Sequence, residues 1–207
     1  MKVKKMEQCN TCKDMIDYHE IVDCITYALD AKDSYTAGHS QRVSDMCIIV
    51  CRLLGLTASE SEQIHIAAHL HDIGKIGVPD AVLKKEGRLT DEEFEEIKKH
   101  SAIGADILAH SKRLSELCDL VRHHHERFDG RGYPDRLAGE SIPFGARVIA
   151  VCDSIDAMTS NRCYRKAFDF DYCRSEIERN SGLMYDPHIV DIVLSNWEQV
   201  IGVVKQR

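Results

Sequence analysis

Proline is scarce in this chain, and its placement constrains the fold more than any other feature. The four prolines, Pro79, Pro134, Pro143 and Pro187, leave long proline-free stretches among the 207 residues. Within those stretches apolar residues recur three or four positions apart, which is the spacing of an amphipathic helix. No alternating apolar and polar pattern, the signature of a half-buried strand, competes with it. The sequence therefore predicts an all-α bundle of about seven to nine helices.

Seven segments carry this helical pattern. They are residues 21–33, 42–55, 57–74, 90–111, 115–128, 146–160 and 186–200. Thr57 is a candidate N-cap, and the segment that begins at Thr90 has acids first and lysines later, as the helix dipole favours. Trp197 is expected to pack into the core near the C-terminus. Residues 1–13 are predicted to be a variable leader, and residues 14–207 a single domain.

Composition and charge exclude several classes of protein. Hydrophobic residues make up 43% and charged residues 29%, as in an ordinary soluble domain. A formal charge of -7 does not favour DNA binding, so a protein of this kind that handles phosphate needs local positive charge or metal ions. The longest apolar run, residues 46–51, is too short to span a membrane. No membrane association is therefore expected.

The cysteines bear on the cellular compartment. Nine is an odd number for a disulfide framework, and most cysteines stand singly in apolar surroundings. Buried free thiols of this kind are typical of a reducing cytoplasm, and the N-terminus lacks the apolar stretch of a signal peptide. Cys9 and Cys12 form one CxxC pair, which would need two further ligands to complete a zinc site. We therefore expect a cytoplasmic protein with no disulfides.

Histidines and aspartates fall at positions that suggest a metal site. His71 and Asp72 are adjacent at the end of a helical segment, where a terminal imidazole ligand can lie beside a bridging carboxylate. Asp153 lies within an apolar helical segment, where a carboxylate is costly unless it is paired or binds a cation. Asp156 lies on the same helical face and is expected to hydrogen bond to a ligand. Further candidates are His39, His100 and the triplet His123–His125.

Taken together, these motifs resemble an HD-GYP domain, a branch of the HD phosphohydrolase superfamily. The matching segments are KDSYTAGHSQRV (32–43), HLHDIGKIGVPD (69–80), EIKKHSAIGADIL (96–108), HHERFDGRGYPD (124–135) and ARVIAVCDSIDAMTSNRCYRKA (146–167). The resemblance covers roughly residues 20–195. It implies an all-α HD-domain fold and a metal-dependent phosphodiesterase that hydrolyses cyclic di-GMP to pGpG, GMP or both.

The resemblance also implies a set of metal ligands. One metal would take His39, His71, Asp72 and Asp153, and a second would share Asp72 and take His100, His124 and His125. The register set by the Gly-Tyr-Pro loop leaves His123 outside the pair. Some relatives carry a glutamate and a third metal at the position of Tyr35, so only two divalent ions are expected here. Iron or manganese suits these ligands best, with nickel, cobalt and zinc as alternatives.

A mechanism follows from that assignment. Two cations roughly 3.5–4 Å apart can share a water and deprotonate it, and the resulting hydroxide would attack phosphorus in line. By resemblance, Lys75 contacts the scissile phosphate, and Asp72 and Lys75 are the catalytic residues. Substrate contacts are expected from Lys75, Gly132, Tyr133, Arg162 and Arg165. Asp129 is expected to brace its loop rather than to bind metal.

Other interpretations remain open from sequence alone. The substrate could be 3′,3′-cyclic GMP-AMP or another nucleotide phosphoester, or the chain could be a module that binds a nucleotide or docks a partner without catalysis. The sequence also allows a homodimer through the N-terminal helix, and docking of other cyclic-dinucleotide enzymes on the loop near Gly132. The remaining histidines, His19, His65, His69, His110 and His188, match no ligand position and are expected to be structural or exposed.

Overall fold

The computed structural model describes residues 18–32, 38–161 and 166–205. The α-helices are α1 (Tyr18–Lys32), α2 (His39–Leu53), α3 (Ala58–Leu70), α4 (Asp80–Leu83), α5 (Asp91–Ala109), α6 (Cys118–Arg122), α7 (Phe144–Thr159), α8 (Phe170–Arg179), α9 (Pro187–Ser195) and α10 (Trp197–Lys205). Three short 3₁₀-helices are η3 (Ile73–Gly77), η4 (Ser115–Leu117) and η5 (Gly139–Ser141). Within the described ranges no strand forms, and the predicted all-α class is confirmed.

The prolines lie where a helix can accept them. Pro79 and Pro143 immediately precede α4 and α7, and Pro187 is the first residue of α9, where the missing N–H has no helical partner to lose. The side chain of Asp186 caps α9 by accepting a hydrogen bond from the backbone N–H of His188. Pro134 lies in the loop between α6 and α7. The proline-free stretches are therefore the stretches that form the long helices.

Two long helices begin with the same capping device. Thr57 accepts a hydrogen bond from the backbone N–H of Glu60, and the Glu60 carboxylate accepts one from the backbone N–H of Thr57, at 3.3 and 2.9 Å. Thr90 and Glu93 repeat this reciprocal arrangement at the start of α5. Each box satisfies two backbone donors that the first turn leaves unpaired. The predicted cap at Thr57 is confirmed.

The described residues contain ten α-helices, against the seven to nine expected. The difference comes from α4 and α8, which lie outside the seven predicted segments, and from the segment 186–200, which forms two helices, α9 and α10. Two predicted segments also end early. The segment 57–74 stops being α-helical at Leu70, and the segment 115–128 is helical only to Arg122. Both early ends fall immediately before histidines of the candidate site.

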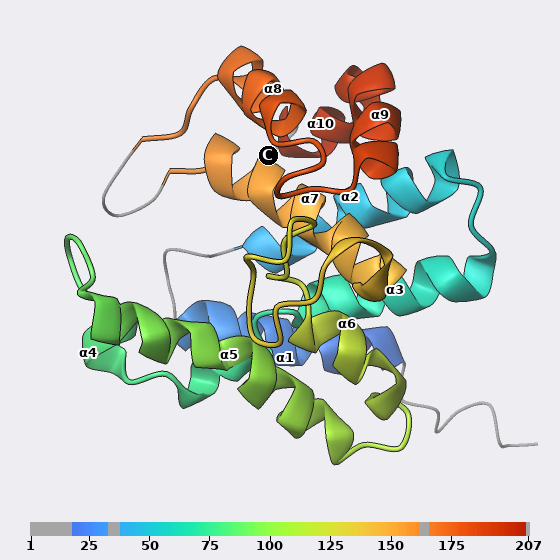
Figure 1. Cartoon of the computed structure of the whole chain (residues 1–207). Helices are drawn as coiled ribbons and strands as arrows, with labels where there is room; N and C mark the ends of the chain where they lie inside the picture. The colour runs from blue at the N-terminus through green and yellow to red at the C-terminus, as the bar shows by residue number, and fades with distance from the viewer. Residues whose placement is uncertain (1–17, 33–37, 162–165, 206–207) are drawn as a thin grey trace, which may run out of the picture.

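The core is formed by α2, α3 and α7, with the C-terminal helices packed onto it. In Figure 1, α8, α9 and α10 lie at one end of the molecule, α1, α4 and α5 lie at the other, and α2, α3 and α7 lie between them. Val43, Met46 and Val50 of α2 are fully buried. Trp197 is 5% exposed and belongs to the same apolar cluster, which confirms its predicted place. The candidate site lies where this central layer meets α5.

The cysteines in the described ranges are free thiols. Cys47, Cys51 and Cys152 are buried in the core, whereas Cys118 is half-buried and its Sγ lies 3.2 Å from the carbonyl oxygen of Ala105. Cys9 and Cys12 lie outside the described residues. The buried thiols agree with the sequence expectation for the three core positions.

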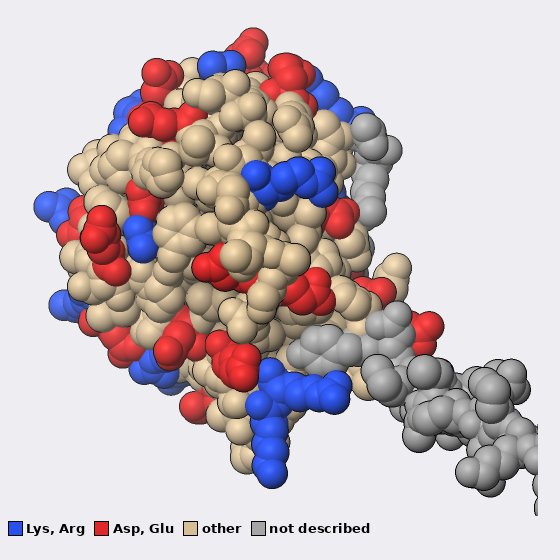
Figure 2. All heavy atoms as spheres, turned by 90° about the vertical axis from the view of Figure 1, so that its right-hand side faces the viewer, with Lys and Arg blue, Asp and Glu red and all other residues tan. Residues whose placement is uncertain are grey.

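Two further features are the distribution of charge on the surface and the apolar character of the helices. Figure 2 shows acidic and basic side chains interspersed over the face that it presents, with other residues between them. Among the described residues, no helix combines the length and the apolar character needed to cross a membrane.

Candidate metal centre

The adjacent His71 and Asp72 lie at the point where α3 ends. His71 is the C-cap residue of α3, and Asp72 immediately precedes η3. Both side chains are buried, with residue exposures of 1% and 7%. The His71 Nδ1 lies 2.7 Å from the carbonyl oxygen of Ala68, and its Nε2 lies 3.4 Å from Asp72 Oδ2. The end of the helix therefore aims both side chains toward the same interior point.

A close backbone approach brings α5 to this pair. A Cβ on Gly74 would lie 1.8 Å from the carbonyl oxygen of His100 and 2.5 Å from the backbone nitrogen of Gly104. Only glycine can occupy this position without pushing η3 away from α5. The contact places His100 Nε2 3.4 Å from Asp72 Oδ1. Gly74 is therefore what allows α5 to contribute to the site.

His39 and Asp153 come from two further helices, α2 and α7. The His39 Nε2 lies 3.2 Å from Asp153 Oδ1, and its Nδ1 lies 2.6 Å from Asp156 Oδ2. Asp156 is fully buried, and Arg42 Nε donates to its other oxygen at 2.5 Å. The hydrogen bond expected of Asp156 is therefore present, and it fixes the orientation of the His39 ring.

The three consecutive histidines divide after α6 ends at Arg122. The His124 Nδ1 lies 2.6 Å from the carbonyl oxygen of Val121, and its Nε2 lies 3.3 Å from the His100 Nε2. The His125 ring packs against His124, with a distance of 4.0 Å between ring centroids. His123 turns away, and its Nε2 lies 3.0 Å from Asp135 Oδ2. Because the helix ends at Arg122, His124 and His125 can both face the cluster while His123 points away from it.

The structure brings all seven predicted ligand residues together. Three groups have ligand atoms within 4.8 Å of one another: His39, His71 and Asp153; His100, His124 and His125; and His71, Asp72 and His124. The first group falls entirely within the set predicted for one metal, and the second within the set predicted for the other. The third group joins the two through Asp72. Three helices and the two segments that follow α3 and α6 thus converge on a single buried cluster.

The hydrogen bonds at Nδ1 test whether this cluster suits a cation. His71, His100 and His124 each face the carbonyl oxygen of the residue three positions earlier, at 2.7, 2.7 and 2.6 Å. A carbonyl oxygen only accepts, so Nδ1 carries the proton and Nε2 presents its lone pair. The Nε2 atoms of His100 and His124 then face each other at 3.3 Å as two acceptors. A cation satisfies both, and such backbone contacts are usual for metal-binding histidines.

The electrostatics keep most of these histidines neutral. Burial lowers the pKa of His124, and the neighbouring His125 and His71 lower it further. Burial lowers the pKa of His125 to about 3, and it also lowers the pKa of His100. These three imidazoles are therefore uncharged at neutral pH, and a neutral imidazole is the form that binds a metal.

Asp72 and His39, by contrast, are held in their charged forms. Burial raises the pKa of Asp72, but Lys75 and the surrounding histidines outweigh burial and hold that pKa well below its ordinary value. Burial lowers the pKa of His39, but hydrogen bonds to Asp153 and Asp156 raise it to about 9. The His39 Nε2 proton thus lies between the ring and Asp153, where a cation would replace it. The donor set therefore fits one or more divalent cations.

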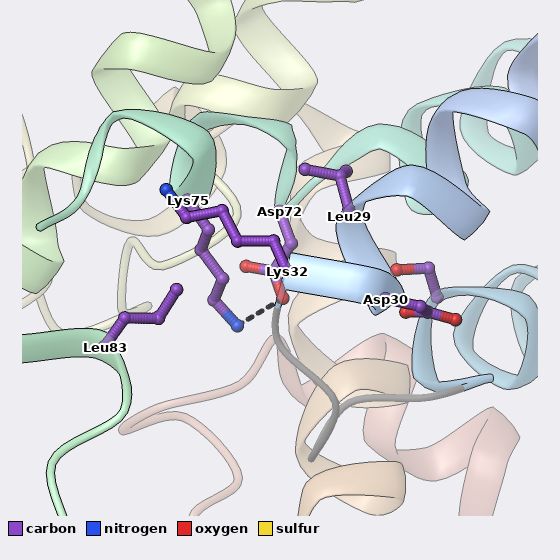
Figure 3. Close-up of a pocket in the computed structure, with 7 residues that line it drawn as sticks. Leu29, Asp30, Lys32, Asp72, Lys75 and Leu83 are labelled. Carbon is purple, nitrogen blue, oxygen red and sulfur yellow. Dashed lines mark hydrogen bonds and ion pairs between the residues drawn. The ribbon is translucent and has the colours of Figure 1, made fainter. Parts of the chain in front are cut away.

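Lys75 lies at the outer edge of the cluster. Its Nζ lies 2.6 Å from Asp72 Oδ2, as the dashed line in Figure 3 marks. Figure 3 also shows Lys32 and Leu83 beside this pair, around a small pocket of about 10 Å³. The predicted catalytic pair of Asp72 and Lys75 is therefore in direct contact. The expected contact of Lys75 with a phosphate stays a prediction.

The loop between α6 and α7 closes the other side of the cluster. A Cβ on Gly132 would lie 2.3 Å from the Arg127 nitrogen, so the loop folds back tightly on its own backbone. Tyr133 places its ring 4.9 Å from the His125 ring. Asp129 Oδ1 accepts from Arg127 Nε and from the backbone N–H of Arg131, at 3.0 and 3.1 Å. Asp129 therefore braces the loop, as expected.

Two supporting residues were not singled out from the sequence. Arg42 holds Asp156, and its signal was the three-residue spacing that puts it on the same face of α2 as His39. The Asp135 carboxylate accepts a hydrogen bond from Arg122 Nε at 2.7 Å and lies 3.0 Å from His123 Nε2. These contacts hold the loop against the end of α6. No local sequence signal predicts this second contact, because it depends on how the loop returns.

Several predicted residues lie outside the described part of the chain. They are Arg162 and Arg165, expected to contact substrate, and Tyr35, on which the prediction of two metals rather than three rests. The remaining histidines take part in none of the potential metal-binding groups found among the described residues. His69 is buried with its Nε2 2.9 Å from Ser44 Oγ, and His19 pairs with Glu62 at 2.8 Å.

Comparison with known proteins agrees with this geometry. The model of the HD domain family matches residues 24–189, so the chain belongs to the HD domain family. Its resemblance to HD-GYP proteins is confirmed by curated relatives. It is 39% identical to the cyclic di-GMP phosphodiesterase response regulator RpfG of Xanthomonas campestris, over 88% of this chain and 50% of that protein.

Other relatives differ in their named substrate. The chain is 35% identical to 3′3′-cGAMP-specific phosphodiesterase 2 of Vibrio cholerae, over 89% of this chain and 36% of that protein. A solved structure of the cyclic GMP-AMP phosphodiesterase V-cGAP3 of V. cholerae matches with a TM-score of 0.68 at 18% identity, covering 89% of this chain and 50% of that one. The chain thus spans half or less of the length of these three proteins.

Proposed function

We propose that this chain is a metal-dependent phosphodiesterase that hydrolyses cyclic di-GMP to pGpG, GMP or both. The observation that carries the proposal is the convergence of seven histidine and aspartate side chains on one buried cluster, edged by Lys75. The family supports it, because relatives such as RpfG are named cyclic di-GMP phosphodiesterases. Residues 14–207 are proposed to form the HD-GYP domain.

The proposed cofactor is a pair of divalent ions, iron or manganese first, with nickel, cobalt and zinc as alternatives. His39, His71, Asp72 and Asp153 would hold one ion, and Asp72, His100, His124 and His125 the other. When bound, such a pair activates water and neutralises charge on phosphoryl oxygens. Asp72 is suited to serve both ions because its two oxygens lie near histidines of the two proposed sets, Oδ2 near His71 and Oδ1 near His100.

The chain's own residues would orient the substrate and the ligands. Lys75 has an ammonium group at the rim of the cluster, where it can contact a phosphoryl oxygen without leaving Asp72. Asp156 keeps the Nδ1 proton of His39 in place and so leaves Nε2 to face the cluster. Gly132 and Tyr133 would form the wall beside His125. Arg162 and Arg165 are proposed to bind substrate phosphates.

A second candidate substrate is 3′,3′-cyclic GMP-AMP. The relative in V. cholerae that is named for this substrate matches over as much of the chain as RpfG does, at nearly the same identity. The chemistry at phosphorus would be the same for both cyclic dinucleotides. The two candidates differ only in which base the surroundings of the cluster accept.

The test is to load the purified protein anaerobically with Mn²⁺ or Fe²⁺, count metal per chain, and assay both dinucleotides. Asp72→Ala should lose metal and all cleavage. Asp171→Ala, an exposed carboxylate on α8, serves as the matched control and should lose neither. Two metals per chain with cleavage of cyclic di-GMP would support the proposal. Cleavage of the mixed dinucleotide alone would change the substrate, and absence of bound metal would refute the site.

A further inference from the structure

A second, larger cleft adjoins the metal centre, and its walls include neither Asp72 nor Lys75. It has a volume of about 840 Å³ and lies between α5 and the loop that joins α6 to α7. His125 belongs both to the histidine cluster and to the wall of this cleft. In Figure 1 the loop passes in front of the centre of the molecule, next to α5. A ligand in the cleft would therefore be in direct reach of the cluster.

The wall of the cleft is basic, although the chain as a whole is acidic. Its charged lining residues are Lys98, Lys99, Arg127, Arg131, Arg136 and the acid Glu95. Just behind the wall, Lys99 pairs with Glu96 at 2.5 Å and Arg127 with Asp129 at 2.7 Å. Lys98 pairs with Glu95 at 2.6 Å, but that carboxylate is 64% exposed, and an exposed ion pair of this kind is readily exchanged for another anion. This is the local positive charge that an acidic protein needs in order to bind phosphate.

Aromatic rings accompany this charge. Phe94, in the first turn of α5, is 46% exposed and lines the cleft. The Lys98 ammonium lies 4.8 Å from the centroid of the Phe94 ring and 5.7 Å from that of the Tyr133 ring. The Tyr133 ring in turn packs on His125. A row of cation and ring faces therefore runs from the metal centre out into the cleft.

We propose that this cleft is a subsite for the second nucleotide of a cyclic dinucleotide, the one whose phosphate is not being cleaved. Phe94 stacks on its base, and Lys98 and Arg131 contact its phosphate. The inference rests on the proposed function, because it takes the first phosphate to lie at the metal centre. A cyclic dinucleotide carries two bases and two phosphates, so a subsite for its second half needs an aromatic face and a cation side by side. The cleft wall supplies both.

The volume and the position of the cleft agree with this occupant. Sites for small ligands typically enclose some 300–1,000 Å³. The Phe94 ring is half-exposed, so a base can stack on it without displacing a packed core. Arg131 lies within the loop that Asp129 braces, and its backbone N–H is held by the Asp129 carboxylate at 3.1 Å. A surface for a partner protein is the competing interpretation, and it predicts no dependence on nucleotide.

The test compares Phe94→Ala and Arg131→Ala with Phe94→Trp, which restores a ring, and with Tyr172→Ala, an exposed aromatic outside the cleft. Binding of cyclic di-GMP is measured by calorimetry on chelator-treated protein. KM and kcat are measured on the metal-loaded protein with cyclic di-GMP and with bis(p-nitrophenyl) phosphate, which has no second nucleotide. Because Phe94 and Arg131 are surface residues, circular dichroism should show folded variants.

We expect Phe94→Ala to weaken binding of cyclic di-GMP by roughly 5- to 150-fold, the range of one base stacked on one ring. Its KM for cyclic di-GMP should rise more than its KM for the small diester, and Phe94→Trp should recover most of the loss. Wild-type cleavage with unchanged binding in Phe94→Ala would overturn the subsite and leave the proposed function standing. Binding that depends on Phe94 without any cleavage would support the subsite and refute the proposed activity. Neither binding nor cleavage by the wild type would overturn both.

Discussion

The tightest contact around the metal centre makes a sharp prediction about Gly74. In Gly74→Ala the new Cβ would lie 1.8 Å from the His100 carbonyl oxygen, whereas real Cβ contacts essentially never fall under 3.0 Å. Both partners are backbone atoms in helical elements, so no side chain can rotate to relieve the clash. η3 and α5 must separate by at least about 1.2 Å, the difference between those two distances.

The expected magnitude follows from overpacking. Forcing extra atoms into a packed interface costs about 1–3 kcal/mol. For a chain of this size each kcal/mol lowers the Tm by roughly 2–4 °C, so the Tm should fall by about 2–12 °C. The same separation pulls His100 away from Asp72 Oδ1, which now lies 3.4 Å from its Nε2. The variant should therefore lose one bound metal more readily than the other.

Differential scanning calorimetry and metal counting by mass spectrometry would check both effects. Gly202→Ala is a suitable control, because its Cβ would meet nothing within 4 Å and alanine is the better helix former by about 1 kcal/mol. That control should keep or raise the Tm and keep its metal. A Gly74→Ala protein with wild-type Tm and wild-type metal content would refute the reasoning that this glycine holds α5 against η3.

Three further predictions concern the residues around the ligands. Asp156→Asn should lower metal affinity by about 10- to 100-fold, because it weakens the hydrogen bond that orients His39. In chelator-treated protein, Tm should decline as pH rises from about 6.5 to 9. Folding raises the pKa of His39 from 6.5 to about 9, so protonated His39 stabilises the fold fully below pH 6.5, and this stability is lost as the ring loses its proton. His123→Ala should keep its metal, but its free energy of unfolding should fall by about 0.5–1.5 kcal/mol, because the hydrogen bond to Asp135 is removed.

Each of these has a measurement and an opposing result. Competition with a chelator of known affinity measures the first, and unchanged affinity in Asp156→Asn would contradict it. Thermal melts over the pH range check the second, and a slope that persists in His39→Gln would show that another group titrates. Denaturant unfolding checks the third, where loss of metal from His123→Ala would show that this histidine is a ligand after all.

The sequence was sufficient to place the ligands in one cluster but not to describe its surroundings. Proline placement and helical spacing predicted the all-α fold, and the motifs around His39, His71 and Asp153 named residues that the structure brings together. The ends of α3 and α6 were predicted too late, because buried residues continue past Leu70 and Arg122 after the backbone has left the α-helix. Periodicity records burial, and a residue can be buried after its helix has ended.

The cleft beside α5 was not predictable for a different reason. Phe94 and Lys98 read as part of the solvated face of a charged helix, and nothing local distinguishes them from its other exposed residues. Their role depends on Tyr133, which is distant in the chain and arrives only because the loop returns over α5. Such contacts are set by tertiary structure, so a single sequence carries no direct signal for them.

The bonds that hold the histidine rings have a consequence for how such a centre can change over time. His71, His100 and His124 each take their orientation from a carbonyl only three residues earlier. The orientation of each histidine ring is thus set within a four-residue unit. It does not depend on the segments that connect one unit to the next. Insertions and deletions in those connections can accumulate without re-aiming the rings. The same four-residue units could be grafted onto another helical scaffold with their ring orientation retained.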